Sequence, residues 1–165
     1  MRQKEFAVGV RIEHLQSKIG FAQYGKAYTQ LPSADYKLVS HASERATFTF
    51  CMCPGGYVVN ASSEDRKLAI NGMSYSKRDS KSANSAIIIS VTPKDYSSDN
   101  PLSGLEFQRM LEDKAYCLGE GSIPFTTYGE LCKNLDTPML LSGQNTALFS
   151  DFQGNTKGTV KQADL

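Results

Sequence analysis

The most distinctive run of the sequence is residues 51–57, Cys-Met-Cys-Pro-Gly-Gly-Tyr, in which two thiols lead directly into a turn without side chains at its tip. Because glycine has no β-carbon, Gly55 and Gly56 would let a planar ligand lie against the backbone. The alternative is a tight hairpin that needs glycine for its backbone conformation, with Cys51 and Cys53 as small apolar fillers. The spacing alone leaves both interpretations open.

A second polar cluster spans residues 71–79, Asn-Gly-Met-Ser-Tyr-Ser-Lys-Arg-Asp, and Asn84 follows shortly after it. Amide and hydroxyl groups of this kind line pockets for polar ring systems. We therefore take Asn71, Ser74 and Asn84 as candidate substrate ligands, with Arg78 able to grip an anionic substrate through two parallel hydrogen bonds. A solvated loop is the alternative interpretation of the same residues.

Several classes of chemistry lose support because their motifs are absent from the sequence. Neither G-x-G-x-x-G nor G-x-x-x-x-G-K-[ST] occurs, so no phosphate-cradling loop is expected in this chain. The two histidines, His14 and His41, form no H-x-x-x-H, and neither C-x-x-C nor G-x-S-x-G occurs, which disfavours hydrolases and a metal site. A Cys51–Cys53 disulfide is also disfavoured, since one intervening residue on an extended strand makes an unstrained bridge hard to close.

Length and composition indicate a single packed domain over residues 1–165. The chain is 40% hydrophobic and 21% charged, and its formal net charge is +1, so no global field favours nucleic acid or an anionic membrane. No signal peptide and no span of about 20 apolar residues is evident. We expect a cytoplasmic protein with reduced cysteines.

Period-2 alternation predicts most of the strands. Residues 6–12 predict a strand, followed by candidates at 36–41, 46–53, 57–62 and 68–73. Within 46–53, Phe48, Phe50 and Met52 are expected on one face, and the glycine pair is expected to turn that strand into a hairpin with 57–62. Residues 86–91 are apolar on both faces, which predicts a central strand covered from both sides.

Helix signals are strongest in the last third of the chain. Ser103 and Glu106 have capping-box spacing, and Gly119 is placed to end the helix in the left-handed conformation. The expected apolar stripe comprises Phe107, Met110, Leu111, Ala115 and Leu118. A weaker helix is considered over 14–28 and a short one near 128–134, where Thr127 and Glu130 repeat the capping-box spacing.

Residues 139–165 are rich in polar and small side chains, and we expect a loosely packed return segment there. Together these elements predict an α+β fold with a largely antiparallel β-sheet and a few helices packed on one side.

Several runs of the sequence resemble a known family. Residues 6–14, 22–25, 31–38, 50–59, 71–76, 83–86 and 101–109 together resemble the middle region of bacterial FAD-dependent (NAD/FAD-utilising) dehydrogenases. The run Cys51-Met-Cys-Pro-Gly-Gly is the most specific of these. The resemblance implies that an FAD-binding fold precedes this region and resumes after it.

The resemblance also implies roles for the candidate residues. Cys51, Cys53, Gly55 and Gly56 would face the flavin ring in the full-length protein, while Asn71, Ser74, Arg78 and Asn84 would line the substrate or flavin edge. The partner would be the FAD-binding domain of the same chain, and this region alone would bind no FAD. The rival hypothesis is a free-standing, non-catalytic module that binds a small molecule or a protein.

Overall fold

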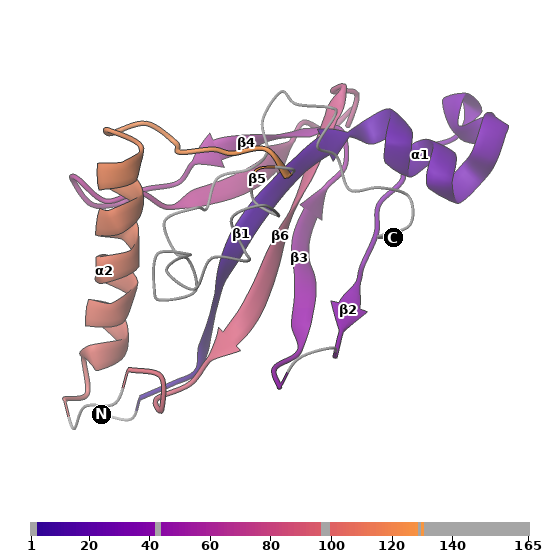
Figure 1. Ribbon diagram of the computed structural model, residues 1–165. Coiled ribbons are helices and arrows are strands. Elements are labelled where there is room, and N and C mark those ends of the chain that lie inside the picture. Colours follow the sequence, from indigo (N-terminus) through magenta and orange to yellow (C-terminus); the bar gives the residue numbers. More distant parts are fainter. Residues whose placement is uncertain (1–2, 42–43, 97–99, 129, 131–165) are drawn as a thin grey trace.

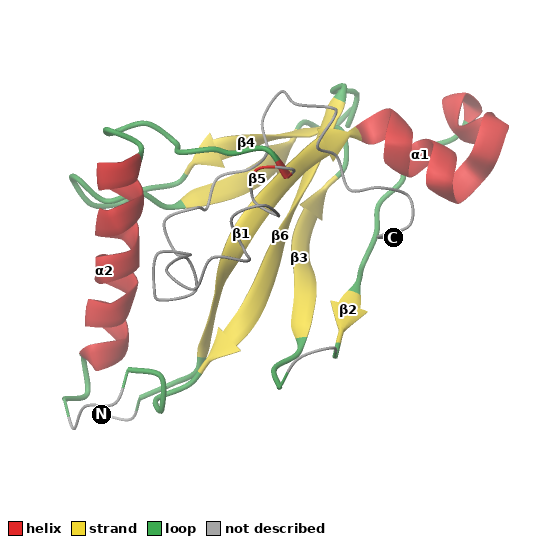
Figure 2. Cartoon of the chain, in the orientation of Figure 1, coloured by secondary structure: helices red, strands yellow, loops and turns green. Residues whose placement is uncertain are grey.

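A computed structural model describes residues 3–41, 44–96, 100–128 and 130 (Figure 1). Its elements in chain order are β1 (Phe6–Leu15), α1 (Gln16–Tyr24), the 3-10 helix η1 (Gly25–Gln30), β2 (Val39–Ser40), β3 (Thr47–Cys53), β4 (Gly56–Asn60), β5 (Ile70–Ser74), β6 (Ser82–Val91) and α2 (Ser103–Leu118). Every strand pair is antiparallel, and Figure 2 shows the helices at the periphery of the strands. The predicted α+β class is confirmed.

The larger sheet has the strand order β1-β6-β3-β2. β1 pairs with β6 along its whole length, from Phe6 opposite Val91 to Leu15 opposite Ser82. The predicted strand at 6–12 is therefore confirmed, and β6 lies at the centre as expected. Its residues Ile87 to Ile89 are only half-buried, however, so the expected cover on both faces is not observed.

A β-bulge interrupts β3 at the first cysteine. Phe50 lies opposite Ala86 and Cys53 lies opposite Asn84, so two residues of β3 face a single residue of β6. Cys51 adopts a φ of 47°, in the left-handed region that non-glycine residues rarely enter. The bulge shifts the alternation, so Cys53 rather than Met52 continues the face of Phe50, and the predicted face pattern is wrong beyond that residue.

The glycine turn does not form the predicted hairpin. β4 follows the turn but pairs with β5, with Gly56 opposite Ser74 and Asn60 opposite Ile70, in a separate two-stranded sheet. The turn thus carries the chain from one sheet to the other. The physical reason is that residues 73–78 pack directly against the turn, where the Ser74 hydroxyl donates to the Pro54 carbonyl, so β5 lies beside β4.

The segments on either side of β2 are less regular than predicted. The helix considered over 14–28 ends at Tyr24, where Gly25 takes a φ of 57°, and η1 continues the chain. Of the strand expected at 36–41, only Val39 and Ser40 pair, opposite Phe48 and Thr47.

Helix α2 begins where the sequence predicts, but Leu102 takes the N-cap position and no side chain caps the first turn. Asn100 accepts a hydrogen bond from the Leu102 amide at 2.9 Å through its side-chain oxygen, and its amide nitrogen donates to Glu106 at 3.1 Å. Ser103 instead donates to the carbonyl of Asn100. The expected Ser103 capping box is therefore wrong. The left-handed turn also comes later than expected, since Gly119 has a φ of −87° while Gly121 has one of 85°.

Only part of the predicted stripe of α2 is buried. Leu111 and Ala115 are buried, and Phe107 packs against Phe6, with ring centroids 6.1 Å apart. Met110 and Leu118 are 41% and 58% exposed, so their assignment to the buried stripe is wrong. α2 stands beside the β1 edge of the larger sheet (Figure 1).

The last described residues confirm the second capping box. Thr127 donates its hydroxyl to the Glu130 carboxylate at 2.8 Å, and the Glu130 amide donates to the Thr127 hydroxyl at 3.2 Å. Most of the helix expected near 128–134, the return segment 139–165 and Cys132 lie outside the described residues. Among those that are described, no helix is long and apolar enough to cross a membrane.

Candidate functional site

A buried arginine lies at the junction of the two sheets. Arg11 is only 4% exposed, and its guanidinium donates to the side-chain oxygen of Asn84 at 2.5 Å and to that of Asn71 at 3.2 Å. It also donates to the backbone carbonyl of Cys51 at 3.3 Å. One side chain of β1 thereby joins β6, β5 and the bulge of β3. A guanidinium suits this role because its planar fork presents donors in several fixed directions.

The carboxamide of Asn84 has a defined orientation. Because a guanidinium only donates hydrogen bonds, the amide oxygen of Asn84 must face Arg11. The amide nitrogen then points elsewhere, and it has no hydrogen-bond partner among the described residues although Asn84 is fully buried. A buried donor of this kind favours the approach of an acceptor, either a water molecule or a ligand oxygen.

Gly72 closes the site from the side of β5. A β-carbon at this position would overlap the Arg11 guanidinium and the Asn84 side-chain oxygen, and would lie 2.7 Å from the Cys53 sulfur. Any larger residue would therefore push the network apart. Gly72 allows the small sheet to rest directly on the polar cluster.

The two cysteines border this cluster on the solvent side. Cys51 is exposed and Cys53 half-buried, and both are free thiols. The sulfur of Cys53 donates to the Cys51 carbonyl at 3.3 Å, the same oxygen that accepts from Arg11. The bulge therefore holds its carbonyl toward Arg11. Strained backbone and bulges of this kind concentrate beside functional sites.

The predicted glycines, in contrast, are packed against their own chain. Pro54, Gly55 and Gly56 are all buried. A β-carbon on Gly55, whose φ is 52°, would overlap the Arg78 carbonyl, and one on Gly56 would lie 2.6 Å from both the Met73 carbonyl and the Ser74 hydroxyl. The chain itself fills the space that the missing side chains leave. The glycines are thus required by the close approach of residues 73–78.

The remaining predicted residues belong to this turn. Ser74 donates its hydroxyl to the Pro54 carbonyl at 2.7 Å. Arg78 is exposed, and its backbone carbonyl accepts a hydrogen bond from Ser33 at 2.6 Å. The amide of Gly55 donates to the side chain of Gln16 at 2.8 Å.

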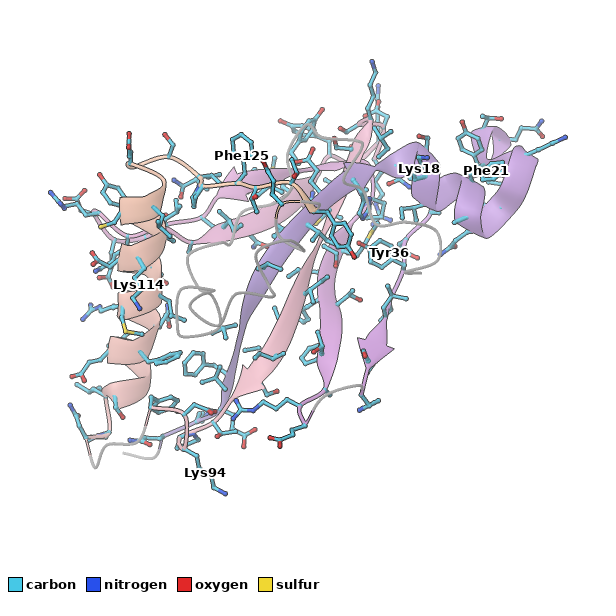
Figure 3. The ribbon with its side chains drawn as sticks, viewed as in Figure 1. Lys18, Phe21, Tyr36, Lys94, Lys114 and Phe125 are labelled. Atoms are coloured by element: carbon cyan, nitrogen blue, oxygen red, sulfur yellow. The ribbon has the colours of Figure 1, made fainter. Side chains whose placement is uncertain are left out.

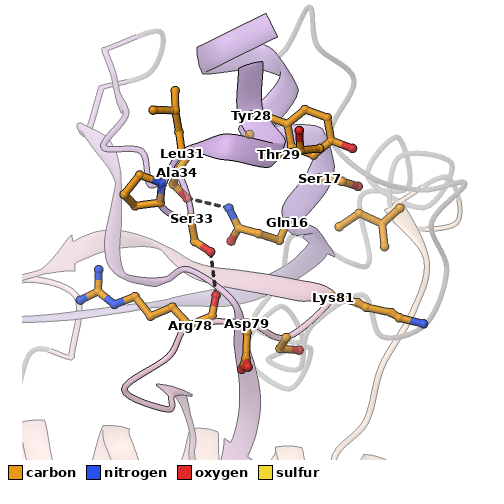
Figure 4. A pocket seen from close by; sticks show the side chains of 14 residues that line it. Gln16, Ser17, Tyr28, Thr29, Leu31, Ser33, Ala34, Arg78, Asp79 and Lys81 are labelled. Carbon is orange, nitrogen blue, oxygen red and sulfur yellow. Dashed lines mark hydrogen bonds between the residues drawn. The ribbon is translucent and has the colours of Figure 1, made fainter. Parts of the chain in front are cut away.

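Gln16 connects the turn to a cavity of about 400 Å³ behind it (Figure 4). Its amide nitrogen donates to the Ala34 carbonyl at 2.8 Å, and Arg78, Asp79 and Lys81 line the same cavity. The charges around the cavity are mixed, so it has no strong preference for anions.

A second buried polar pair lies where β1 ends. His14 is 5% exposed, and its Nε2 atom lies 2.7 Å from the Tyr36 hydroxyl (Figure 3 labels Tyr36). Burial lowers the pKa of His14 to about 4 and raises the pKa of Tyr36. His14 is therefore neutral at physiological pH and serves as a packed core residue. Register places it on the opposite face of β1 from Arg11.

The structure thus divides the predicted residues into two groups. Cys51, Cys53, Asn71 and Asn84 meet around Arg11, whereas Gly55, Gly56, Ser74 and Arg78 form the turn beside them. Sequence reasoning missed Arg11 and Gly72. No local signal could have found Arg11, because the alternation of residues 6–12 places it on the polar face of the strand.

The cluster can bind and orient a polar ligand. Within the described ranges no three His, Cys, Asp or Glu side chains gather as a metal site. Asn71 and the Cys51 thiol are accessible, and a positive charge lies directly beneath them. Such a surface can hydrogen-bond to the edge of a polar ring and favour negative charge that develops on it.

Comparison with known proteins gives two results. The family profile described as "FAD-dependent protein, C-terminal domain-like" matches residues 5–152. A protein of Clostridium beijerinckii, described as an uncharacterized protein, is 46% identical over 140 residues, which cover 81% of this chain and 26% of that protein. The chain therefore spans about a quarter of the length of this relative.

Proposed function

The chain belongs to the family of FAD-dependent proteins with this C-terminal domain-like region, and we propose that it is a substrate-side domain that covers the flavin ring of a full-length oxidoreductase. The observation that supports this role is the Arg11 network, which holds an accessible thiol and an accessible amide over a buried positive charge. The sequence resemblance favours a cytoplasmic dehydrogenase that exchanges hydride with a nicotinamide cofactor.

The FAD-binding fold belongs, in this proposal, to the part of the full-length protein beyond the present chain. The span of about a quarter of the relative leaves room for such a fold, and residues 1–165 contain no glycine-rich dinucleotide motif. We propose that parts of this fold flank the domain on both sides. The family's description as C-terminal domain-like supports an order in which most of that fold comes first. A free-standing binding module is the alternative, and the longer relative supports the excised domain over it.

The geometry refines the proposed flavin-facing surface. Cys51, Cys53 and Asn71 can contact a ring, since they lie at the surface or half-buried. Gly55 and Gly56 would affect the ring only indirectly. They allow residues 73–78 to pack closely against the turn, which fixes the bulge. FAD would supply the hydride chemistry. The residues of this chain would orient the ring edge and exclude water from it.

The proposed substrate residues also take different tasks. Asn71 is the accessible one, and Asn84 positions Arg11 from a fully buried site. Ser74 fixes the turn through Pro54, and Arg78 offers a cation at the cavity behind it. No side chain of the cluster has the geometry that would mark it as the general acid or base.

Two spectroscopic measurements test the proposal. The purified chain should be colourless after incubation with FAD and gel filtration, because it lacks a pyrophosphate-binding loop. In the full-length protein, Cys51→Ser and Asn71→Ala should change the flavin absorbance or its reduction rate while the protein stays folded. The matched control is Cys117→Ser, which changes an exposed thiol on α2. Equal spectra and rates in all three variants would contradict the proposed flavin-facing surface.

A further inference from the structure

A cavity between the larger sheet and α2 adjoins the candidate site. Its volume is about 410 Å³, within the range of small-molecule pockets. Its lining comes from β1, β6, β5 with the segment before it, and α2. We propose that it binds an elongated, mostly apolar small molecule and, on the premise of the proposed function, that it holds the apolar part of the substrate.

The floor of the cavity is shaped by small side chains. Ala7 and Gly9 of β1 and Ala86 of β6 line it, with Ile88 beyond them. Register places these residues on one face of the sheet, because Gly9 lies opposite Ile88 and Ala86 lies opposite Arg11. The small side chains of Ala7 and Ala86 leave depth that larger ones would fill, whereas a β-carbon on Gly9 would overlap the Ile87 carbonyl of β6.

The roof, formed by α2, is held away from the floor at two points. At one end, Phe107 of α2 rests on Phe6 and Tyr96, with ring centroids 6.1 and 5.9 Å away. Near the middle of the helix, the Leu68 amide donates to the Glu112 carbonyl at 3.0 Å. Lys67 also pairs with Asp113 at 3.0 Å. These contacts support α2 from an aromatic cluster and a loop, so the helix does not collapse onto the small residues of the floor.

The sides of the cavity are apolar, and polar side chains line it at α2 and at Arg11. Leu68, Ile70 and Leu111 line the sides, whereas Gln108 and Glu112, joined by a 2.8 Å hydrogen bond, stand at the helix. Arg11 lines the cavity and its guanidinium organises the candidate site. A ligand lying on the floor would therefore have its apolar body under Leu111 and its polar end toward the Arg11 cluster.

A series of straight-chain carboxylates from six to twelve carbons, followed by calorimetry on the purified chain, tests this inference. We expect one saturable site, with the dissociation constant falling about fourfold per added methylene until the cavity is full. Ala86→Phe should weaken binding at least tenfold by filling the floor. Ile87→Phe, on the opposite face of the same strand, is the control and should leave binding unchanged. Circular dichroism establishes that both variants are folded.

Three outcomes would overturn the inference. They are absence of saturable binding in the unaltered chain, equal binding by both variants, and binding that begins only when residues 139–165 are removed. The last would assign the cavity to the chain's own segment. Because these measurements use no flavin, their failure leaves the proposed FAD function standing. A failure of the flavin experiments likewise leaves the cavity result intact.

Discussion

Replacing Arg11 with methionine tests whether this residue holds the two sheets together. Methionine keeps most of the apolar stem but removes all guanidinium donors. The Asn84 oxygen is fully buried and the bond of the Cys51 carbonyl to Arg11 is partly buried, so both lose a donor that water does not readily replace. Asn71 is exposed and regains a hydrogen bond from water.

An unsatisfied buried acceptor costs roughly 1–3 kcal/mol. Two of them give about 2–4 kcal/mol, since the Cys51 carbonyl keeps its weak contact with the Cys53 thiol. We therefore expect Arg11→Met to lower the free energy of unfolding by about 2–4 kcal/mol in urea titrations.

The control is Arg109→Met on α2, which breaks an exposed ion pair with Glu64. Pairs of that kind contribute about 0–1 kcal/mol. Adding Asn84→Leu to Arg11→Met should recover part of the loss, because both partners of the buried hydrogen bond are then apolar. A cost of Arg11→Met no larger than that of Arg109→Met would refute the network as a source of stability.

Three further predictions concern the core. Burial lowers the pKa of His14 to about 4, below its unfolded value of 6.5, so the unfolded state binds more protons in this range. The free energy of unfolding should therefore fall by up to about 3 kcal/mol as pH drops from 6.5 to 4, which urea unfolding at both pH values measures. An equally large loss in His14→Gln would show that another group causes the pH dependence. Gly72→Ala should cost about 1–3 kcal/mol because its β-carbon overlaps the polar cluster, whereas Gly104→Ala in α2, whose β-carbon would lie 3.3 Å from the Tyr96 ring, should cost less. Leu111→Ala should cost about 2–5 kcal/mol and Met110→Ala, which is exposed, under about 1 kcal/mol; equal values in thermal unfolding would show that the buried face of α2 is misassigned.

Local sequence patterns predicted the elements that bury one apolar face. The alternation of residues 6–12 identified β1, and the helical spacing around Leu111 identified α2, because each pattern reports directly on burial. The helix cap was misassigned for a local reason. Ser103 favours a cap, but the helix begins at Ser103 and Leu102 takes the N-cap position. The loop geometry before the helix, which the sequence does not reveal, decides this.

Strand pairing was beyond local reasoning. A glycine turn between two strand patterns predicts a hairpin when both strands have free edges. Here β3 pairs with β6, a strand from a distant part of the chain, while β4 pairs with β5, so the same turn transfers the chain to a second sheet. The burial of Arg11 has the same origin. Its position on the polar face of β1 predicts exposure, and only the long-range placement of β5 covers it.

The glycine turn shows how the site prediction changes once packing is known. Gly55 and Gly56 suggested a surface on which a planar ligand could lie, yet the closest atoms to their absent side chains belong to residues 73–78. Their conformational freedom is used inside the chain, where it brings the second polar run against the bulge. The accessible part of the site is Cys51, an exposed residue whose carbonyl accepts a hydrogen bond from Arg11. Flavin contact should therefore depend first on Cys51 and Asn71, and on the glycines only through the geometry they impose.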